Sequence, residues 1–218
     1  MPDHKTERPT LERPTLKCPS IKTTGGAPTP EQWQTLPVHH LRNVKTGEPP
    51  FHATVIQTAY DPDARLWFVR FDGDDPAWVS DYTTHDETIW TQDVFEMFYD
   101  DAGKEIEYKE LETSPRNVRF DANIYFTPPS KFRTDTSWDI PWDSQTVYDD
   151  QAQRLTSVWV LPFDSLERTP APGVRMPINF YRIDRGSEHE NGAEFSAWSP
   201  TWSGTFHDPY HFGWIEFT

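Results

Sequence analysis

Residues 51–73 read FHATVIQTAYDPDARLWFVRFDG, and this stretch decides the fold. Apolar and polar side chains alternate with a period of two along both halves, which is the pattern of β-strands with one buried face. Between the halves lies the sequence DPDA, whose residue types favour a tight turn. We therefore expect a strand, a turn and a second strand antiparallel to the first.

The same pattern recurs along the rest of the chain. Further strand-like segments cover 93–101, 108–114, 122–126, 155–163, 176–184, 194–199 and 211–217. Clusters of Asp, Gly and Pro separate them, and no long segment sustains the 3.6-residue period of a helix. Many short strands with turn signals between them predict an all-β fold, an antiparallel two-sheet β-sandwich that is jelly-roll-like.

The N-terminal part of the chain differs in composition. Nine of the 21 prolines lie in the first 50 residues, and the pentapeptide ERPTL occurs twice within 7–16. We expect residues 1–28 to form an extended or disordered arm and residues 29–218 to form a single β-sandwich domain. Leu11, Leu16 and Ile21 are the residues of the arm that could pack along an edge of the sandwich.

The charge balance restricts the classes of partner. The chain carries a formal net charge of −15, with 20 Lys and Arg against 35 Asp and Glu. A phosphate backbone repels such a chain, and no basic stripe is present, which argues against nucleic acid as a partner. No apolar run reaches transmembrane length. The N-terminus lacks the apolar region of a signal peptide, so we expect a cytoplasmic protein for the sequence as given.

Residues 88–101, TIWTQDVFEMFYDD, suggest a binding face. Alternation places Phe95, Met97 and Tyr99 on one face, which suits a core, and Trp90 and Glu96 on the other. Fully extended, Trp90 and Glu96 would be about 20 Å apart, and a bulge would bring them closer. An aromatic ring and a carboxylate on one face suit a sugar, because the ring packs against C–H groups and the carboxylate accepts hydroxyl hydrogen bonds. The alternative is that Trp90 caps the core and Glu96 is solvated.

Five segments, in order, resemble parts of family 9 carbohydrate-binding modules. They are residues 59–76, 89–101, 157–166, 176–185 and 197–217, and residues 29–36 resemble the start of these modules. The resemblance therefore covers about residues 29–218. It implies a β-sandwich that grips the end of a glycan between two aromatic rings, often with structural calcium.

The resemblance also implies roles for individual residues. Trp90 is one ring of the clamp, and Phe206 is the other, at a position where better-known members carry Trp. The second stacking face is therefore smaller here. Glu96 matches the carboxylate that bonds to sugar hydroxyls.

Three further positions complete the implied carbohydrate-binding site. Glu112 stands where the family has an Arg, which removes a hydrogen-bond donor. Arg182 could supply a guanidinium instead. Tyr181 lies at a position that the family uses for a polar contact.

Acidic turns are candidates for calcium. The sequences DGDDP at 72–76 and DDAG at 100–103 combine carboxylates with turn carbonyls, which suit Ca²⁺, although Asp is also an ordinary turn residue. The candidate ligands are Asp74, Asp75, Asp100 and Asp101. Calcium bound there would be structural, and we expect no required cofactor.

Motifs of catalysis do not appear in the sequence. It contains no nucleophile elbow, P-loop, dinucleotide-binding glycine pattern or HExxH. We predict a non-catalytic module that binds an oligo- or polysaccharide and assists the breakdown of cellulose- or xylan-type glycans. One alternative is a structural or protein-interaction sandwich with a decayed sugar site. A glycoside hydrolase with its carboxylate pair hidden among the 35 acids is a third hypothesis.

Overall fold

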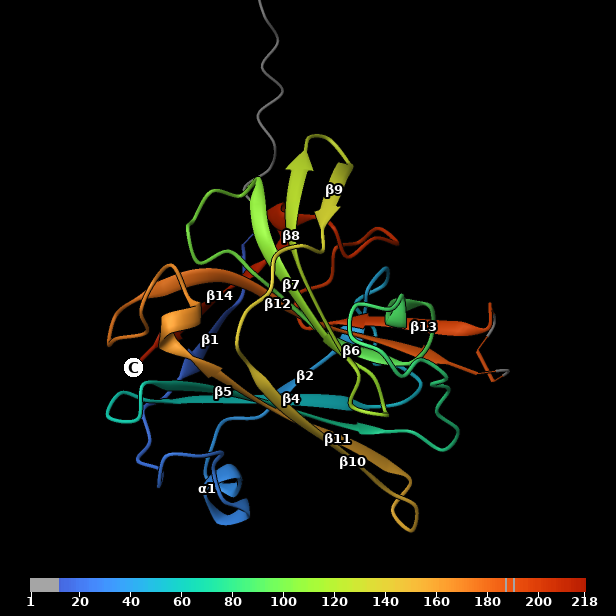
Figure 1. Cartoon of the computed structure of the whole chain (residues 1–218). Helices are drawn as coiled ribbons and strands as arrows, with labels where there is room; N and C mark the ends of the chain where they lie inside the picture. Colours follow the sequence, from blue (N-terminus) through green and yellow to red (C-terminus); the bar gives the residue numbers. More distant parts are fainter. Residues whose placement is uncertain (1–11, 187, 190) are drawn as a thin grey trace, which may run out of the picture.

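The computed structural model describes residues 12–186, 188–189 and 191–218, which form two packed β-sheets (Figure 1). The larger sheet has the strand order β1-β14-β12-β6-β7-β8-β9, with β13 paired to β12 and β3 paired to β13. The smaller sheet has the order β10-β11-β5-β4-β2. All strand pairs are antiparallel except β1 with β14. The predicted two-sheet β-sandwich is confirmed.

The strands of the larger sheet are β1 (Thr15–Cys18), β3 (Arg42–Asn43), β6 (Val94–Tyr99), β7 (Glu107–Thr113), β8 (Arg119–Thr127), β9 (Lys131–Asp135), β12 (Arg175–Arg185), β13 (Ala193–Ala197) and β14 (Gly213–Phe217). Those of the smaller sheet are β2 (His39–His40), β4 (Thr54–Asp61), β5 (Leu66–Asp74), β10 (Asp143–Asp149) and β11 (Arg154–Pro162).

The β4–β5 hairpin forms where the sequence predicts it. Tyr60 pairs with Trp67, and Asp61 pairs with Leu66. The carboxylate of Asp61 accepts hydrogen bonds from the backbone N–H groups of Asp63 and Ala64, at 2.9 and 3.0 Å. This side chain therefore holds the turn that its neighbours Pro62 and Ala64 complete.

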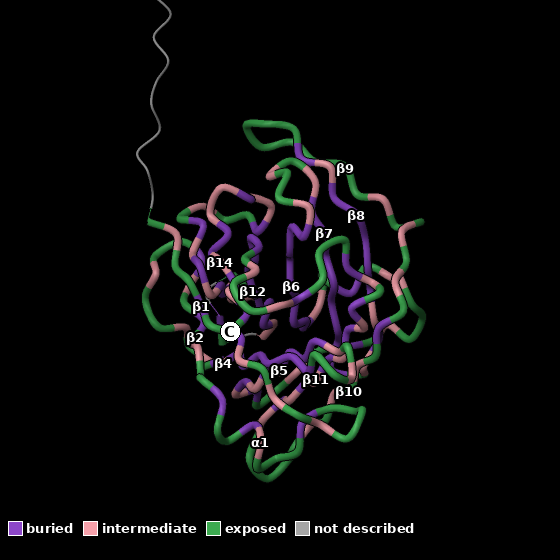
Figure 2. Tube along the Cα trace, turned by 90° about the vertical axis from the view of Figure 1, so that its left-hand side faces the viewer, coloured by how far each residue is buried: buried purple, intermediate pink, exposed green. Residues whose placement is uncertain are grey.

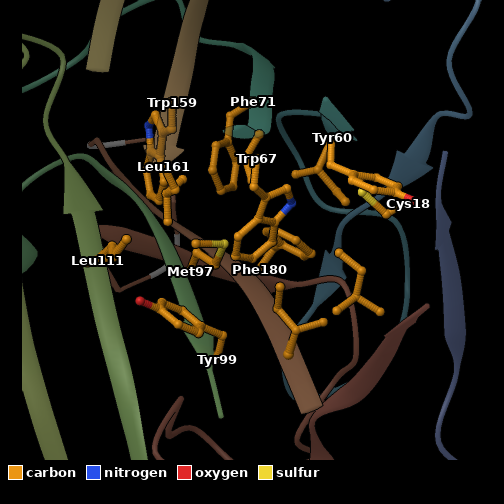
Figure 3. Close-up of a cluster of buried hydrophobic side chains, with 14 of the residues drawn as sticks. Cys18, Tyr60, Trp67, Phe71, Met97, Tyr99, Leu111, Trp159, Leu161 and Phe180 are labelled. Atoms are coloured by element: carbon orange, nitrogen blue, oxygen red, sulfur yellow. The ribbon is translucent and has the colours of Figure 1, made fainter. Parts of the chain in front are cut away.

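The core lies between the two sheets (Figure 3). Met97 and Tyr99 of β6 face Trp67 and Phe71 of β5, as the alternation along residues 93–101 predicts. The rings of Phe71 and Phe95 stack with centroids 4.9 Å apart. These side chains are fully buried, so the sandwich is held together mainly by removal of aromatic surface from water.

The larger sheet is also covered on its outer face. A second cluster of buried apolar side chains lies there and includes Val94, Phe98, Tyr108, Phe120 and Ile124. Figure 2 accordingly shows β6, β7 and β8 as mostly buried. Side chains of opposite parity on one strand therefore enter two separate apolar environments.

The expected N-terminal arm needs a correction over residues 12–28. β1 lies parallel to β14, and its Leu16 and Cys18 are fully buried in the core. Beyond β1, the N–H of Ile21 donates to the carbonyl of Tyr60 at 2.8 Å. The edge role expected for Leu16 is present, so this segment belongs to the sandwich. Leu11 lies outside the described residues.

Edge strands with weak apolar patterns were missed. β9 is almost wholly exposed, and β10 exposes every second residue. Both lie at the end of a sheet, where charged and polar side chains are common and a buried face is not required. The short pairings β1, β2 and β3 were also not predicted.

The helices of the described residues are short. α1 (Pro30–Gln34) has five residues and begins with a capping box between Thr29 and Gln32. Its Trp33 packs with Ala59 and Phe68 against the outside of the smaller sheet, below which α1 lies in Figure 1. The other helices are single 3₁₀ turns at Ile89–Thr91, Phe163–Ser165 and Pro209–His211. None of these helices is long and apolar enough to cross a membrane.

Truncation of Leu16 tests the role of the N-terminal segment. Leu16→Ala should lower the free energy of unfolding by about 2–5 kcal/mol, because it opens a cavity in a packed core. Glu12→Ala, at an exposed position of the same segment, is the control and should change it by less than about 0.5 kcal/mol. Urea unfolding measures both. Equal effects of the two variants would show that β1 is not part of the cooperative fold.

Candidate functional site

A cavity of about 430 Å³ opens on the outer face of the larger sheet. Strands β6, β7, β8 and β12 supply its floor, and β9, β13 and two loops supply its walls. The residues that line it are Trp90, Glu96, Glu110, Phe120, Phe132, Thr134, Ile183, Phe195, Gly204, Thr205, Phe206 and His207. Three residues proposed from the sequence, Trp90, Glu96 and Phe206, therefore meet in one cavity.

Trp90 lies in the loop before β6. The strand alternation does not extend back to Trp90, because Ile89–Thr91 form a 3₁₀ turn and β6 begins only at Val94. The fully extended spacing from Glu96 therefore does not apply. Trp90 is 36 % exposed, and its ring makes an edge contact with Phe120, with centroids 4.9 Å apart. One part of the ring is thus supported, and the rest faces open space.

Asp93 anchors this loop to the sheet. Its carboxylate accepts the backbone N–H of Val79 at 2.6 Å and that of Arg185 at 3.0 Å. Burial raises the pKa of Asp93 to about 7. The buried carboxyl group of Asp93 therefore ties the loop that carries Trp90 to two other segments, one at Val79 and one at Arg185.

Phe206 lies in the loop between β13 and β14. Its ring stacks on Tyr181 with centroids 4.2 Å apart and planes 18° apart, and the hydroxyl of Tyr181 donates to the carbonyl of Phe206 at 3.0 Å. Only 7 % of Phe206 is exposed. Its ring contacts within the described chain are with Tyr181 and Phe195, and not with Trp90, so the two rings of the expected clamp are not packed on each other.

Glu96 belongs to a cluster of three carboxylates. Glu96 on β6 pairs directly with Glu112 on β7, and Glu110 lies two residues away on the same face. One oxygen of each carboxylate lies within 4.8 Å of the other two. Glu96, Glu110 and Glu112 are 2, 6 and 0 % exposed. Oε1 of Glu96 and both oxygens of Glu112 have no hydrogen-bond partner among the described residues.

Burial dominates the acid–base behaviour of this cluster. It raises the pKa of Glu110 to about 7 and the pKa of Glu96 and of Glu112 well above the ordinary value for glutamate. Repulsion from the neighbouring carboxylates raises the pKa of Glu96 and Glu112 further. The cluster therefore retains protons near neutral pH.

His207 closes one wall without adding charge. Its ring stacks on Phe132 with centroids 3.6 Å apart, and its Nδ1 lies 2.9 Å from the hydroxyl of Tyr108. Burial lowers the pKa of His207 far below its usual value, so the imidazole is neutral. No sequence pattern selects His207, Phe132 or Phe195, because only the tertiary fold brings them together.

The placement of Arg182 at the sugar site was wrong. Its guanidinium lies on the inner face of β12, where it donates to Thr54 Oγ1 at 2.9 Å, the carbonyl of Asp74 at 2.7 Å and Asp75 Oδ2 at 3.0 Å. Adjacent residues of a strand point to opposite faces. Tyr181 consequently faces the cavity side, where it is fully buried beneath Phe206.

Among the described residues, the two acidic turns do not bring their carboxylates together in one calcium site. Asp74 pairs with Arg154. Asp100 accepts the N–H groups of Gly103 and Glu105, and Asp101 accepts that of Glu167. Asp75 does approach Asp93 and Asp184, but Arg182 already supplies the positive charge there, 3.0 Å from Asp75 and 3.3 Å from Asp184. Calcium at these turns stays a prediction.

Two other groups of side chains combine imidazole and carboxylate donors. One consists of His52, Asp184, Glu188 and His189, and the other of His85, Asp121 and Asp139. In each group the donor atoms lie within 4.8 Å of one another. Asp184, Glu188 and His189 belong to one local segment, whereas His52 joins them from a distant part of the chain. The three members of the other group come from separate segments.

Three solved structures share this fold, and two of them contain a bound sugar. A family 9 carbohydrate-binding module from Caldicellulosiruptor kristjanssonii in complex with glucose matches with a TM-score of 0.66 and 12 % identity, over 94 % of this chain and 95 % of that one. The same kind of module with cellotriose matches with a TM-score of 0.65 and 14 % identity, over 94 % and 93 %. A Bacteroides uniformis protein, described as a candidate carbohydrate-binding protein, matches with a TM-score of 0.71 and 15 % identity, over 95 % and 100 %.

No protein-family model matches the chain, and no curated protein matches it. The resemblance to family 9 modules that the sequence indicated is thus confirmed for the fold, over nearly the whole chain. At 12–15 % identity the structural likeness establishes the fold alone.

The carboxylate cluster should make stability depend on pH. Glu110 has a higher pKa folded than unfolded, so its contribution to stability is complete below about pH 4.3 and is lost as pH rises through about 7. Glu110→Gln should therefore leave the free energy of unfolding nearly unchanged at pH 4 and raise it by about 3–4 kcal/mol at pH 8. Urea unfolding of wild type and variant across this range measures the difference.

Glu48→Gln is the control for this experiment, because Glu48 is exposed. It should leave stability unchanged at both pH values. A Glu110→Gln variant that is less stable than wild type at pH 8 would contradict the assignment of a buried carboxyl group with raised pKa.

Proposed function

We propose that this chain binds a saccharide without catalysis, with the terminal sugar seated in the cavity between Trp90 and Phe206. The observation that carries this proposal is that both rings line one open cavity whose floor presents the carboxylate of Glu96. A pyranose needs apolar surface for its C–H faces and polar acceptors for its hydroxyl groups. The cavity offers both.

The two rings would contribute unequally. Each apolar sugar face that leaves water contributes about 1–2 kcal/mol, at roughly 25 cal/mol per Å². Trp90 presents the larger and more exposed ring, whereas Phe206 is mostly covered and rests on Tyr181. Trp90 should therefore account for most of the stacking.

The ligands of the similar structures indicate the class of glycan. Glucose and cellotriose occupy the two family 9 modules, and both consist of glucose rings. A β-1,4-linked glycan of the cellulose or xylan type is the corresponding ligand class for this chain. Such binding fits an accessory role in glycan breakdown, in which the module holds the polymer and another protein cleaves it.

The carboxylate cluster does not favour a glycoside hydrolase. Hydrolysis of this kind uses one protonated and one ionised carboxyl group on either side of the bond. Here the three carboxyl groups lie together on the floor, and burial raises the pKa of all three. The site is therefore proposed as a binding site only.

One observation favours a second candidate, an interaction domain whose sugar site has decayed. Phe206 is nearly covered, and in place of the expected donor at position 112 stands a buried carboxylate. A structural role would need no open cavity beside Trp90. The following experiment separates the two functions.

Replacement of Trp90 tests sugar binding. Trp90→Ala should weaken binding of soluble β-1,4-glucan oligosaccharides at least tenfold, because about 1.4 kcal/mol corresponds to a factor of ten. Isothermal titration calorimetry measures the affinity. The melting temperature should fall by only a few degrees, since the indole is partly exposed.

The matched control is Trp202→Ala, which removes another exposed indole that does not line the cavity. It should leave affinity unchanged. If wild type binds no glycan of a broad panel, or if both variants lose affinity equally, the proposed function is wrong and the interaction domain is favoured.

A further inference from the structure

The floor of the cavity carries buried carboxyl groups that have no cationic partner within the described part of the chain. Glu96 and Glu110 line the cavity, and Glu112 is the cross-strand neighbour of Glu96. Oε1 of Glu96 is buried and accepts no hydrogen bond from any described residue. A buried carboxylate in this condition is costly unless it is protonated or meets a cation.

No Lys or Arg among the described residues pairs with these carboxylates. Lys45 lies beside the lining residue Gly204. The Arg185 guanidinium is 5.6 Å from the ring of Phe195, another lining residue. Neither of these two cations forms an ion pair with the glutamates.

Lys109 is on the same strand as Glu110 but on its other face, where its amine bonds to Asn123 at 3.0 Å and lies 3.4 Å from Glu167. Arg182 is likewise turned to the inner face of its strand. His207 borders the cavity, but its ring is neutral.

The walls are suited to a positive charge as well. Five aromatic side chains line the cavity, namely Trp90, Phe120, Phe132, Phe195 and Phe206. The faces of such rings attract ammonium groups, and this attraction strengthens when water is displaced. Buried carboxylates beneath a set of aromatic rings form the environment that selects an organic cation over a neutral molecule.

We propose that the ligand is an amino sugar, whose ammonium group rests on Glu96 and Glu110 while its ring stacks on Trp90. This inference depends on the proposed saccharide binding and specifies its ligand class. A β-1,4-linked glucosamine chain has the backbone of cellulose, with an amine in place of one hydroxyl group on each ring. It therefore fits the same clamp and supplies the missing charge.

A divalent cation fits the cavity less well. Calcium takes six to eight oxygen ligands, whereas the cluster offers three carboxylates and the rest of the lining is mainly aromatic. An ammonium group needs only a few acceptors and gains from the rings. The experiment below also detects calcium binding, through a rise in melting temperature.

The groups that face the cluster set its pH response. They are Glu96 on β6, Glu110, Glu112 and Tyr108 on β7, Tyr181 on β12, and His207 in the following loop. The tyrosines and the histidine are neutral near pH 7, because burial raises the pKa of both tyrosines and lowers that of His207. Burial raises the pKa of Glu110 to about 7, so this carboxyl group gains a proton between pH 7 and pH 5, and binding of an amine should weaken over that range.

Three trisaccharides with the same linkage test the proposal by isothermal titration calorimetry on the whole chain. They are cellotriose, the glucosamine trimer and the N-acetylglucosamine trimer, which is uncharged. Wild type should bind the glucosamine trimer at least tenfold more tightly than cellotriose. It should not bind the N-acetylated trimer more tightly than cellotriose.

Glu110→Gln keeps the shape of the floor and removes one charge. It should lower the affinity for the glucosamine trimer at least tenfold more than it lowers the affinity for cellotriose, because only the glucosamine trimer carries ammonium groups. Glu48→Gln, on the exposed surface, should change neither. A urea-unfolding curve for each variant verifies that it is folded.

The possible results separate this inference from the proposed function. Equal affinity for cellotriose and the glucosamine trimer would overturn the amino-sugar inference and leave saccharide binding in place. Binding of none of the three, nor of other glycans, would overturn both. A rise in melting temperature with calcium chloride that disappears in Glu110→Gln would assign the carboxylates to a metal ion and would also overturn the inference.

Discussion

The alternation of side chains along β6 is the constraint on which the rest of the structure depends. β6 is hydrogen-bonded to β12 on one side and to β7 on the other, so its register is fixed from both edges. Odd-numbered side chains such as Met97 enter the core between the sheets, and even-numbered ones such as Glu96 enter the outer cavity. A shift by one residue would exchange the two sets and place carboxylates in the aromatic core. The register of β6 therefore determines both the packing of the core and the lining of the cavity.

The same pairing has a cost, because it places like charges opposite each other. Glu96 and Glu112 are direct cross-strand partners, an arrangement that destabilises a sheet even when solvated. Here both are buried, so protonation relieves the repulsion in the free protein and a cation would relieve it in a complex. A sheet selected only for stability would carry apolar side chains at these positions. The carboxylates therefore serve the binding site rather than stability, and the aromatic packing around them compensates for their cost.

Much of the fold could be predicted from the sequence, because the inner strands have a strong period-two pattern, as in β4, β5 and β6. The edge strands β9 and β10 could not, since exposed polar strands leave no such pattern. In the site, Glu110 shares the parity of Glu112 and was recognisable from alternation alone. The same rule shows why Tyr181 and Arg182, as neighbours in one strand, cannot both contact one sugar. Phe132, Phe195 and His207 come from three distant segments, and only the tertiary structure joins them.

The two faces of the larger sheet treat acidic side chains in opposite ways. On the inner face, Asp75 and Asp184 are balanced by Arg182 at 3.0 and 3.3 Å. On the outer face, three glutamates that are at most 6 % exposed form no ion pair within the described chain. A chain of net charge −15 must leave some carboxylates without an ion-pair partner, but such carboxylates are ordinarily exposed to solvent. Because the inner face shows that the fold can supply a guanidinium where one is needed, the acidity of the whole chain does not explain the imbalance at the cavity. The lack of a cationic partner is instead a local property of the cavity, and the aromatic rings around it favour a ligand that carries a positive charge.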